Sequence, residues 1–370
     1  MGDTMTIVFL GTAGGCTHIE HTVELSTRRS CMDGPHMEEN VSLGDHTTLR
    51  AGGKARFFVS VSSEEELVGI IRELKHKHIR WNVIGGGSNI LCSDDGFDGC
   101  VIKMDIQGVH VAEENENVHI HAGAGVSWDA FVSQMVEKGV WGVENLSGIP
   151  GTVGATPIQN VGAYSVEVKG VITDVRAYDT HKESMRVFSN TECQFAYRDS
   201  FFKHAPQGQY IITNVSFSLS KKVQPTIAYK DLRERFGEKN PTLSEIREGV
   251  LQIRSKKFPD LTHVGTAGSF FKNPIVSIEE STRLKGVYPD IPVFPVSETM
   301  SKISLAWVLD KVCHLKGYRE GNVALFEHQP LVLVAYAGAT EKEIHSFAHH
   351  VEEKVFAATG IHIEREVVSL

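Results

Sequence analysis

The segment "GTAGSFFKNP" at residues 265–274 places one hydroxyl, that of Ser269, between small residues and two phenylalanines. The nucleophilic serine of an α/β-hydrolase lies in a Gly-x-Ser-x-Gly turn, and the Ser-x-x-Lys element of β-lactamases has Ser-Asp-Asn and Lys-Thr-Gly companions. Ser269 has neither setting. The sequence therefore argues against a hydrolase and leaves Ser269 as a proton donor, a phosphate ligand or a packed side chain.

A glycine-rich segment, "GGGSN" at residues 85–89, directly follows the apolar run "WNVI". Without Cβ atoms, its backbone N–H groups can approach a diphosphate closely. The segment is neither the G-x-G-x-x-G fingerprint of dinucleotide-binding folds nor the phosphate loop of nucleoside triphosphatases. A plain hairpin turn is about as common an explanation for three glycines in a row.

A second loop, at residues 145–164, is rich in turn-forming residues and is longer than most loops that only connect two secondary-structure elements. The amides of Gln159 and Asn160 could supply donors and acceptors to a flat heterocycle. Together with residues 85–89, this loop predicts a ligand the size of a dinucleotide. The alternative is an Ω-loop packed on itself.

Two groups of charged residues in other segments each allow a structural and a ligand-binding interpretation. Arg198 in "FAYRDSFFK" is flanked by apolar residues, so it either pairs with Asp199 or Asp260 or binds a substrate. The basic group around Lys257 is either a solvated helix end or a contact for an anion. The histidines lack the H-E-x-x-H pattern, so we expect no metal site.

The elements that carry these residues combine helix and strand patterns. Apolar and alternating runs predict strands at residues 81–84, 99–104, 117–123, 171–178, 210–220, 331–336 and 361–370. Helical periodicity predicts helices after a Ser62/Glu65 capping box, from 128 to 138, at 230–237, 243–257 and 301–312, and after a Thr340/Glu343 capping box. This mixture predicts an α+β protein.

Composition limits the partners. The net charge of −9 argues against nucleic acid and anionic membranes, and no apolar run reaches the about 20 residues of a membrane span. Six cysteines without a C-x-x-C pair favour a reducing cytoplasm. Residues 1–37 end in "GPHM", which resembles a protease and cloning scar, so we expect a leader outside the fold.

Several segments together resemble a known family. They are "HTTLRAGGKA", "IGGGSNIL", "IPGTVGATPIQNVGAYSVE", "YRDSFFK", "GTAGSFFKNP" and "IEREV". Their order and spacing are similar to those of the UDP-N-acetylenolpyruvoylglucosamine reductase (MurB) family of bacterial peptidoglycan synthesis, over residues 38–370. The segment "TIAYKDL", which contains Tyr229, resembles the class in which a tyrosine loop closes over the substrate.

The resemblance implies an α+β architecture with an FAD-binding fold of the vanillyl-alcohol-oxidase (PCMH) type. It divides the chain into an FAD-binding subdomain at 38–104 completed by 361–370, a second subdomain at 105–255, and a substrate-binding domain at 256–360. NADPH would reduce bound FAD, and the flavin would then pass a hydride to the enolpyruvyl ether of UDP-N-acetylglucosamine, giving UDP-N-acetylmuramate. The partners would be these small molecules, and the protein a cytoplasmic monomer.

Site residues follow from the resemblance by position. Ser269 would protonate the substrate α-carbon, while Arg198 and Glu366 would stabilise the enolic intermediate. FAD would contact Gly85, Gly86, Gly87, Ser88, Asn89, Pro150, Gly151, Gly154, Ile158, Gln159, Asn160, Gly162, Ala163 and Arg254. The substrate would contact Tyr164, Tyr229, Lys257, Asn273 and Gln329. The alternative functions are another FAD-dependent oxidoreductase of this fold, or a binder without catalysis.

Overall fold

The computed structural model describes residues 36–370. The predicted leader at 1–37 lies outside the described residues except for its last two. Within the described part, no helix combines the length and apolar character needed to cross a membrane. The description below concerns this part alone.

A four-stranded sheet forms first along the chain, in the order β1-β2-β5-β3. Its strands are β1 (Glu38–Ser42), β2 (Lys54–Val61), β5 (Phe97–Met104) and β3 (Trp81–Ile84). Strand β5 pairs in parallel with β2 and β3, while β1 is antiparallel to β2. Helix α1 (Glu64–His76) buries the predicted apolar face, but its N-cap is Ser63, not Ser62, because the Ser63 hydroxyl accepts from the Glu66 amide.

A five-stranded antiparallel sheet follows, in the order β11-β10-β12-β7-β6. Its strands are β11 (Ser184–Ser189), β10 (Ile172–Asp179), β12 (Tyr210–Ser220), β7 (Asn117–Gly123) and β6 (Val109–Glu114). Helix α2 (Trp128–Glu137) packs on this sheet, where the Phe131 ring lies 4.9 Å from that of Phe217. Strands β7, β10 and β12 agree with strands predicted from the sequence, whereas β6 and β11 were not predicted.

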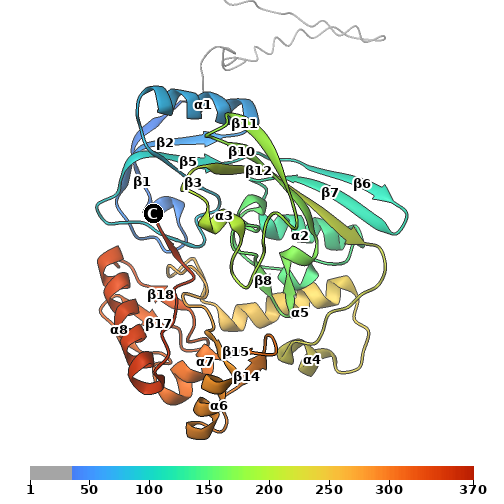
Figure 1. The fold of residues 1–370 in the computed structure, drawn as a ribbon, viewed down its shortest axis with the longest axis vertical. Helices are drawn as coiled ribbons and strands as arrows, with labels where there is room; N and C mark the ends of the chain where they lie inside the picture. The colour runs from blue at the N-terminus through green and yellow to red at the C-terminus, as the bar shows by residue number, and fades with distance from the viewer. Residues whose placement is uncertain (1–35) are drawn as a thin grey trace, which may run out of the picture. The chain divides into compact units, whose positions relative to one another are not determined.

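Two helices lead toward the C-terminal region: α4 (Lys230–Phe236) and α5 (Leu243–Lys257). Thr242 and Glu245 form a capping box at the start of α5. Arg247 of α5 pairs with Asp129 of α2 at 2.7 Å. This ion pair links α5 to α2, the helix that packs on the second sheet (Figure 1).

Small sheets and helices form the C-terminal region. The sheets are β13-β15-β14 (Ile275–Ser277, Met300–Ile303, Val293–Pro295) and β16-β17-β18 (Arg319–Glu320, Val323–Leu325, Leu333–Ala335). The helices are α6 (Ile278–Val287), α7 (Leu305–Trp307), a π-helix η5 (Val308–Val312) and α8 (Glu341–Thr359). Helix α8 lies along β17 and β18 (Figure 1), and Phe347 joins Phe270 and Phe271 in the buried core.

The prediction of one helix at 301–312 was wrong in its first part. Residues 300–303 form β15, the central strand between β13 and β14, and only the later residues are helical. Pairing on both edges satisfies the backbone of β15, and this tertiary pairing overrides the helical pattern. The predicted strand at 361–370 is also shorter: only β19 (Val368–Ser369) is a strand, paired in parallel with β4 (Ile90–Leu91).

Short elements complete the connections. They are the turns of 3₁₀ helix η1 (Gly44–His46), η2 (Glu144–Leu146), η3 (Val153–Ala155) and η4 (Val168–Gly170), the hairpin β8-β9 (Gly162–Ala163, Val166–Glu167), and α3 (Phe201–His204). Most of η2, all of η3 and strand β8 lie in the predicted binding loop at 145–164, so this loop is ordered by local turns and a short hairpin.

Candidate active site

A cleft of about 1720 Å³ is lined by residues from all these regions. It brings together residues 85–89, most of the loop at 149–167, Arg198, Tyr229, the end of α5, Ser269 and Glu366. All but one of the residues that the sequence and the family motifs single out line this cleft; the exception is Asn160. Segments separated by more than half of the chain thus share one cavity.

One side of the cleft, which we call the glycine wall, consists of residues 85–89 and 150–154. The Ser88 hydroxyl donates to the Pro150 carbonyl at 3.0 Å. A Cβ added at Gly86 would lie 2.9 Å from the Gly151 Cα, and one at Gly85 would lie 2.4 Å from the Thr152 Oγ1. The two glycine-rich loops therefore touch through their backbones, which only residues without side chains permit.

The Thr152 hydroxyl is a buried polar group on this wall. Its Oγ1 atom has no hydrogen-bond partner among the described residues. Buried hydroxyls are nearly always hydrogen-bonded, so one without a partner in a cleft is available to a ligand. The glycine wall thus offers backbone N–H groups and a free hydroxyl, which suits an anionic group such as a diphosphate.

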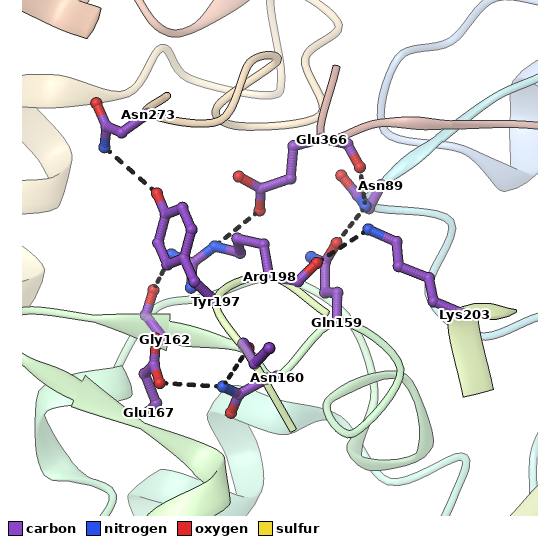
Figure 2. Close-up of polar contacts among 11 residues, drawn as sticks. Asn89, Gln159, Asn160, Gly162, Glu167, Tyr197, Arg198, Lys203, Asn273 and Glu366 are labelled. Carbon is purple, nitrogen blue, oxygen red and sulfur yellow. Dashed lines mark hydrogen bonds and ion pairs between the residues drawn. The ribbon is translucent and has the colours of Figure 1, made fainter. Parts of the chain in front are cut away.

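Asn89 joins the glycine wall to two other segments. Its amide nitrogen donates to the Gln159 side chain at 2.8 Å and to the Glu366 backbone carbonyl at 3.1 Å (Figure 2). One side chain therefore connects the first glycine loop, the second loop and the C-terminal segment.

Asn160 does not face the cleft. It is fully buried, and its amide nitrogen donates to Glu167 at 3.0 Å and to the Ala196 carbonyl at 2.8 Å. Its amide oxygen accepts from the Lys169 N–H. The side chain that we expected to contact the cofactor instead holds its own loop, where Asn160 has a φ of 48°.

A second part of the cleft, which we call the charged wall, contains Arg198 and Glu366, which pair at 3.1 Å with side chains 18% and 12% exposed (Figure 2). The expected structural partners of Arg198 are engaged elsewhere: Asp199 contacts His204 and Asp260 accepts from the Thr262 N–H. The substrate-binding interpretation of Arg198 is thereby favoured over a local ion pair. The sequence could not identify this pair, because its members are far apart in the chain.

Burial raises the pKa of the Glu366 carboxyl, while the charges of Arg198, Lys203 and Lys272 act in the opposite direction. The burial effect is the larger one, since the net shift is upward. A carboxyl with a raised pKa can keep its proton near neutral pH and donate a hydrogen bond. The charged wall therefore contains a potential proton carrier held against a guanidinium.

Ser269 lies next to Glu366 through the backbone. The Glu366 N–H donates to the Phe270 carbonyl at 2.8 Å, and Ser269 forms a bridge with Val332. Phe270 and Phe271, which follow Ser269, are each 1% exposed and pack in the C-terminal core, so they do not line the cleft.

Aromatic and basic residues lie at the end of the cleft near α4 and α5. The rings of Tyr164 and Tyr229 meet edge to face at 5.0 Å, and the Lys257 ammonium lies 5.4 Å from the Tyr229 ring. Lys257 also pairs with Asp231 of α4. Burial raises the pKa of Tyr164 to about 12, so its hydroxyl keeps its proton and can donate.

Arg254, Asn273 and Gln329 complete the predicted set. Arg254 donates to the Gly148 carbonyl at 3.0 Å and lies over the Phe258 ring. Asn273 accepts from the Leu305 N–H at 2.9 Å, which leaves its amide nitrogen toward the cleft, 3.4 Å from the Tyr197 hydroxyl. Gln329 lines the same cleft.

Two lysines of the cleft were missed from the sequence. The Lys302 ammonium lies 4.9 Å from the Tyr197 ring, and burial together with the charge of Arg198 lowers its pKa. Lys203 donates to the Arg198 carbonyl at 3.1 Å (Figure 2). The segment "YRDSFFK" contained Lys203 as a signal, whereas Lys302 was hidden in the helix wrongly predicted at 301–312.

Comparisons with known proteins agree with this arrangement. Residues 55–179 match the model of an FAD binding domain, and residues 260–370 match the model of the UDP-N-acetylenolpyruvoylglucosamine reductase C-terminal domain. A UDP-N-acetylenolpyruvoylglucosamine reductase of Amoebophilus asiaticus is 39% identical over 337 residues, covering 90% of this chain and 98% of the relative. The chain belongs to the UDP-N-acetylenolpyruvoylglucosamine reductase family. The resemblance stated from the motifs is confirmed.

Further members of this reductase family support the same conclusion. The reductase of Neisseria gonorrhoeae is 38% identical over 331 residues, covering 88% of this chain and 94% of its own. The crystal structure of the reductase from Thermus caldophilus superposes with a TM-score of 0.63 at 24% identity, covering 90% of this chain and 99% of that one. These matches confirm the predicted fold class, an α+β protein with an FAD-binding fold and a separate C-terminal domain.

The residues of the glycine wall fit FAD. Part of this wall lies within the matched FAD binding domain. The closely approaching backbones and the Thr152 hydroxyl, which has no hydrogen-bond partner among the described residues, suit a diphosphate. The side-chain amide of Gln159 suits a flat ring. Among residues 36–370, no cluster of three or more His, Cys, Asp or Glu side chains is arranged to hold a metal ion.

Proposed function

We propose that this chain catalyses the NADPH-dependent reduction of UDP-N-acetylglucosamine enolpyruvate to UDP-N-acetylmuramate, with FAD as its bound cofactor. The observation that carries the proposal is the buried Arg198–Glu366 pair beside Ser269, in a cleft whose other wall suits FAD. When bound, FAD accepts a hydride from NADPH and delivers it to the substrate double bond.

FAD is held by the glycine wall and by the loop at 158–163. The backbones of Gly85, Gly86 and Gly87 and the Thr152 hydroxyl would bind its diphosphate, since these residues line the cleft and the Thr152 hydroxyl has no partner among the described residues. Gln159 and the backbone of the loop contact the ring system. Arg254 acts indirectly, because its donation to Gly148 fixes the start of the loop.

The charged wall stabilises the reacting part of the substrate. Reduction of an enol ether that carries a carboxylate develops negative charge on the α-carbon and the carboxylate. Arg198 and protonated Glu366 both donate to that carboxylate, and the raised pKa of Glu366 keeps its proton available. Ser269 then gives its proton to the α-carbon, a step that depends on alignment and exclusion of water because a serine hydroxyl is a weak acid.

The nucleotide part of the substrate lies toward α4 and α5. Lys257 and Lys302 provide positive charge for the diphosphate, and Asn273 and Gln329 provide hydrogen bonds. Tyr229 covers this end of the cleft against Tyr164, at the start of α4. The Lys257–Asp231 pair must open when the diphosphate binds Lys257.

The chain is thereby divided into two functional parts. The FAD-binding part comprises residues 38–104 together with 361–370, and residues 105–255. The substrate-binding part comprises residues 256–360. The separate sheets and the β19–β4 pairing support these boundaries. The protein acts as a cytoplasmic monomer on small molecules and does not bind nucleic acid, in keeping with its net charge of −9.

Two measurements test the function. The absorption spectrum of the purified protein should show bound flavin, and NADPH consumption should depend on UDP-N-acetylglucosamine enolpyruvate. NADPH oxidation that follows oxygen without this nucleotide would indicate another FAD-dependent oxidoreductase. A protein without flavin would contradict the assignment of the glycine wall.

A further inference from the structure

Arg198 lies in a tight turn with a strained backbone. Ala196 and Asp199 form a β-bridge, so Tyr197 and Arg198 are the two residues at the tip. Arg198 has a φ of 53°, in the left-handed region that side chains other than glycine rarely adopt. The guanidinium reaches Glu366 and the Gly162 carbonyl from this conformation. Something must hold the turn in place.

Several side chains contact this turn: Asn160 donates to the Ala196 carbonyl and Asn273 to the Tyr197 hydroxyl, while Lys203 reaches Arg198 itself. Lys203 lies on the short helix α3, and its ammonium donates to the Arg198 carbonyl at 3.1 Å (Figure 2). This hydrogen bond restrains the peptide group that follows Arg198, and thereby helps to hold Arg198 in its left-handed conformation. A charge-assisted hydrogen bond there restrains the direction in which the Arg198 side chain leaves the backbone.

Lys203 is also one of the charges that surround Glu366. The charges of Arg198, Lys203 and Lys272 act to lower the pKa of Glu366. Burial and the charge of Lys272 lower the pKa of Lys203, while Glu366, Asp199 and Glu364 act in the opposite direction. Lys203 lines the cleft, but its hydrogen bond is directed to the backbone of the turn. Lys272 differs, because it pairs with Glu364 at 2.9 Å and makes no contact with Arg198.

We propose that Lys203 is a positioning residue of the active site, which holds the Arg198 turn in its left-handed conformation and places a positive charge beside Glu366. The inference rests on the proposed function, in which Arg198 and Glu366 bind the substrate carboxylate. The turn restraint aligns the guanidinium, and the charge limits the pH range over which Glu366 keeps its proton. Lys203 itself transfers no proton and contacts no reacting atom.

The sign of the electrostatic effect follows from the charge of Lys203. A nearby ammonium favours the carboxylate form of Glu366 and thus lowers its pKa. Removing that charge, as in Lys203→Met, should raise the pKa of Glu366. The proton is then kept to higher pH, so the alkaline limb of the second half-reaction should move to higher pH. The plateau rate should fall by about 10- to 100-fold, because Arg198 is no longer aligned.

The test compares three variants of the FAD-bound protein. The pKa of Glu366 is measured by NMR with ¹³C-labelled glutamate carboxyls, assigned with Glu366→Gln, and stopped-flow gives the rate of flavin reoxidation by the enolpyruvyl nucleotide against pH. Lys203→Arg should restore both properties, since it keeps the charge and the donor. Lys272→Met is the matched control: it should raise the pKa of Glu366 but leave the plateau rate unchanged.

Four results would contradict the proposal in whole or in part. An unchanged pKa of Glu366 in Lys203→Met removes the electrostatic role, and an unchanged plateau rate removes the positioning role. An equal loss in flavin reduction by NADPH would mean a general structural role. If Lys203→Met does not fold, failure of Lys203→Arg to keep the plateau rate would contradict the proposal. The NMR measurement needs no turnover, so it separates failure of this inference from failure of the proposed reaction.

Discussion

The glycine wall and the charged wall of the cleft are built in opposite ways. In the glycine wall, a Cβ at Gly86 would lie within 2.9 Å of Gly151, so binding space exists because side chains are absent. In the charged wall, Arg198 and Glu366 are mostly buried, so function depends on side chains that are costly to place there. Substitutions that add atoms should therefore impair cofactor binding at the glycine wall, whereas substitutions that remove polar groups should impair catalysis at the charged wall.

The largest effect should come from Ser269→Ala on the charged wall. Flavin reduction by NADPH should be retained, because the hydroxyl is needed only for the proton delivered to the substrate. Reoxidation by the enolpyruvyl nucleotide should slow by about 10²- to 10⁴-fold, the scale of a positioned acid. Stopped-flow absorbance of the flavin band measures both steps. Equal slowing of both would instead assign Ser269 to flavin binding or structure.

Glu366→Gln should slow the same half-reaction by about 10²- to 10³-fold, because one charge-stabilising donor is lost. The alkaline limb that reports the Glu366 proton should also disappear, since an amide does not titrate. The matched control is Glu364→Gln, whose side chain is 75% exposed and should leave the rate unchanged. Full turnover in Glu366→Gln would remove this residue from the mechanism.

Gly86→Ala tests the glycine wall by adding atoms. Its Cβ would be forced against the Gly151 backbone, and such overpacking costs about 1–3 kcal/mol, equivalent to about 10- to 100-fold weaker FAD binding. Fluorescence titration of the flavin-free protein with FAD measures the affinity. Gly69→Ala on α1 is the control, because its Cβ would meet nothing within 4 Å. Equal affinities in both variants would contradict the backbone cradle.

Asp231→Asn should have the smallest effect, at the end of the cleft where Tyr229 and α4 lie. Freed from its partner, Lys257 should bind the nucleotide diphosphate more readily and lower KM by up to about fivefold, since a partly exposed pair contributes about 0–1 kcal/mol. Steady-state kinetics measure KM, with Glu234→Gln as the exposed control. A higher KM would show that Asp231 positions Lys257.

The two walls also differ in how well the sequence predicted them. The sequence singled out residues 85–89 as three glycines after an apolar strand, although a plain hairpin turn was an equally common explanation, and the structure places them in the lining of the cleft. The Arg198–Glu366 pair depended on family motifs, since no local pattern indicates a contact between distant segments. Asn160 was misjudged because a polar side chain in a binding loop can satisfy the loop itself. Lys302 was missed because strand pairing overrode its helical pattern.

The side chain of Asn89 has a consequence for folding. Its bond to the Glu366 carbonyl spans 277 residues, and contacts of such long range form late because loop closure must precede them. We therefore expect the site to be among the last parts of the chain to assemble, after the local sheets. On gradual denaturation the same contact should open before the core, so catalytic activity should be lost at lower urea concentration than the secondary structure.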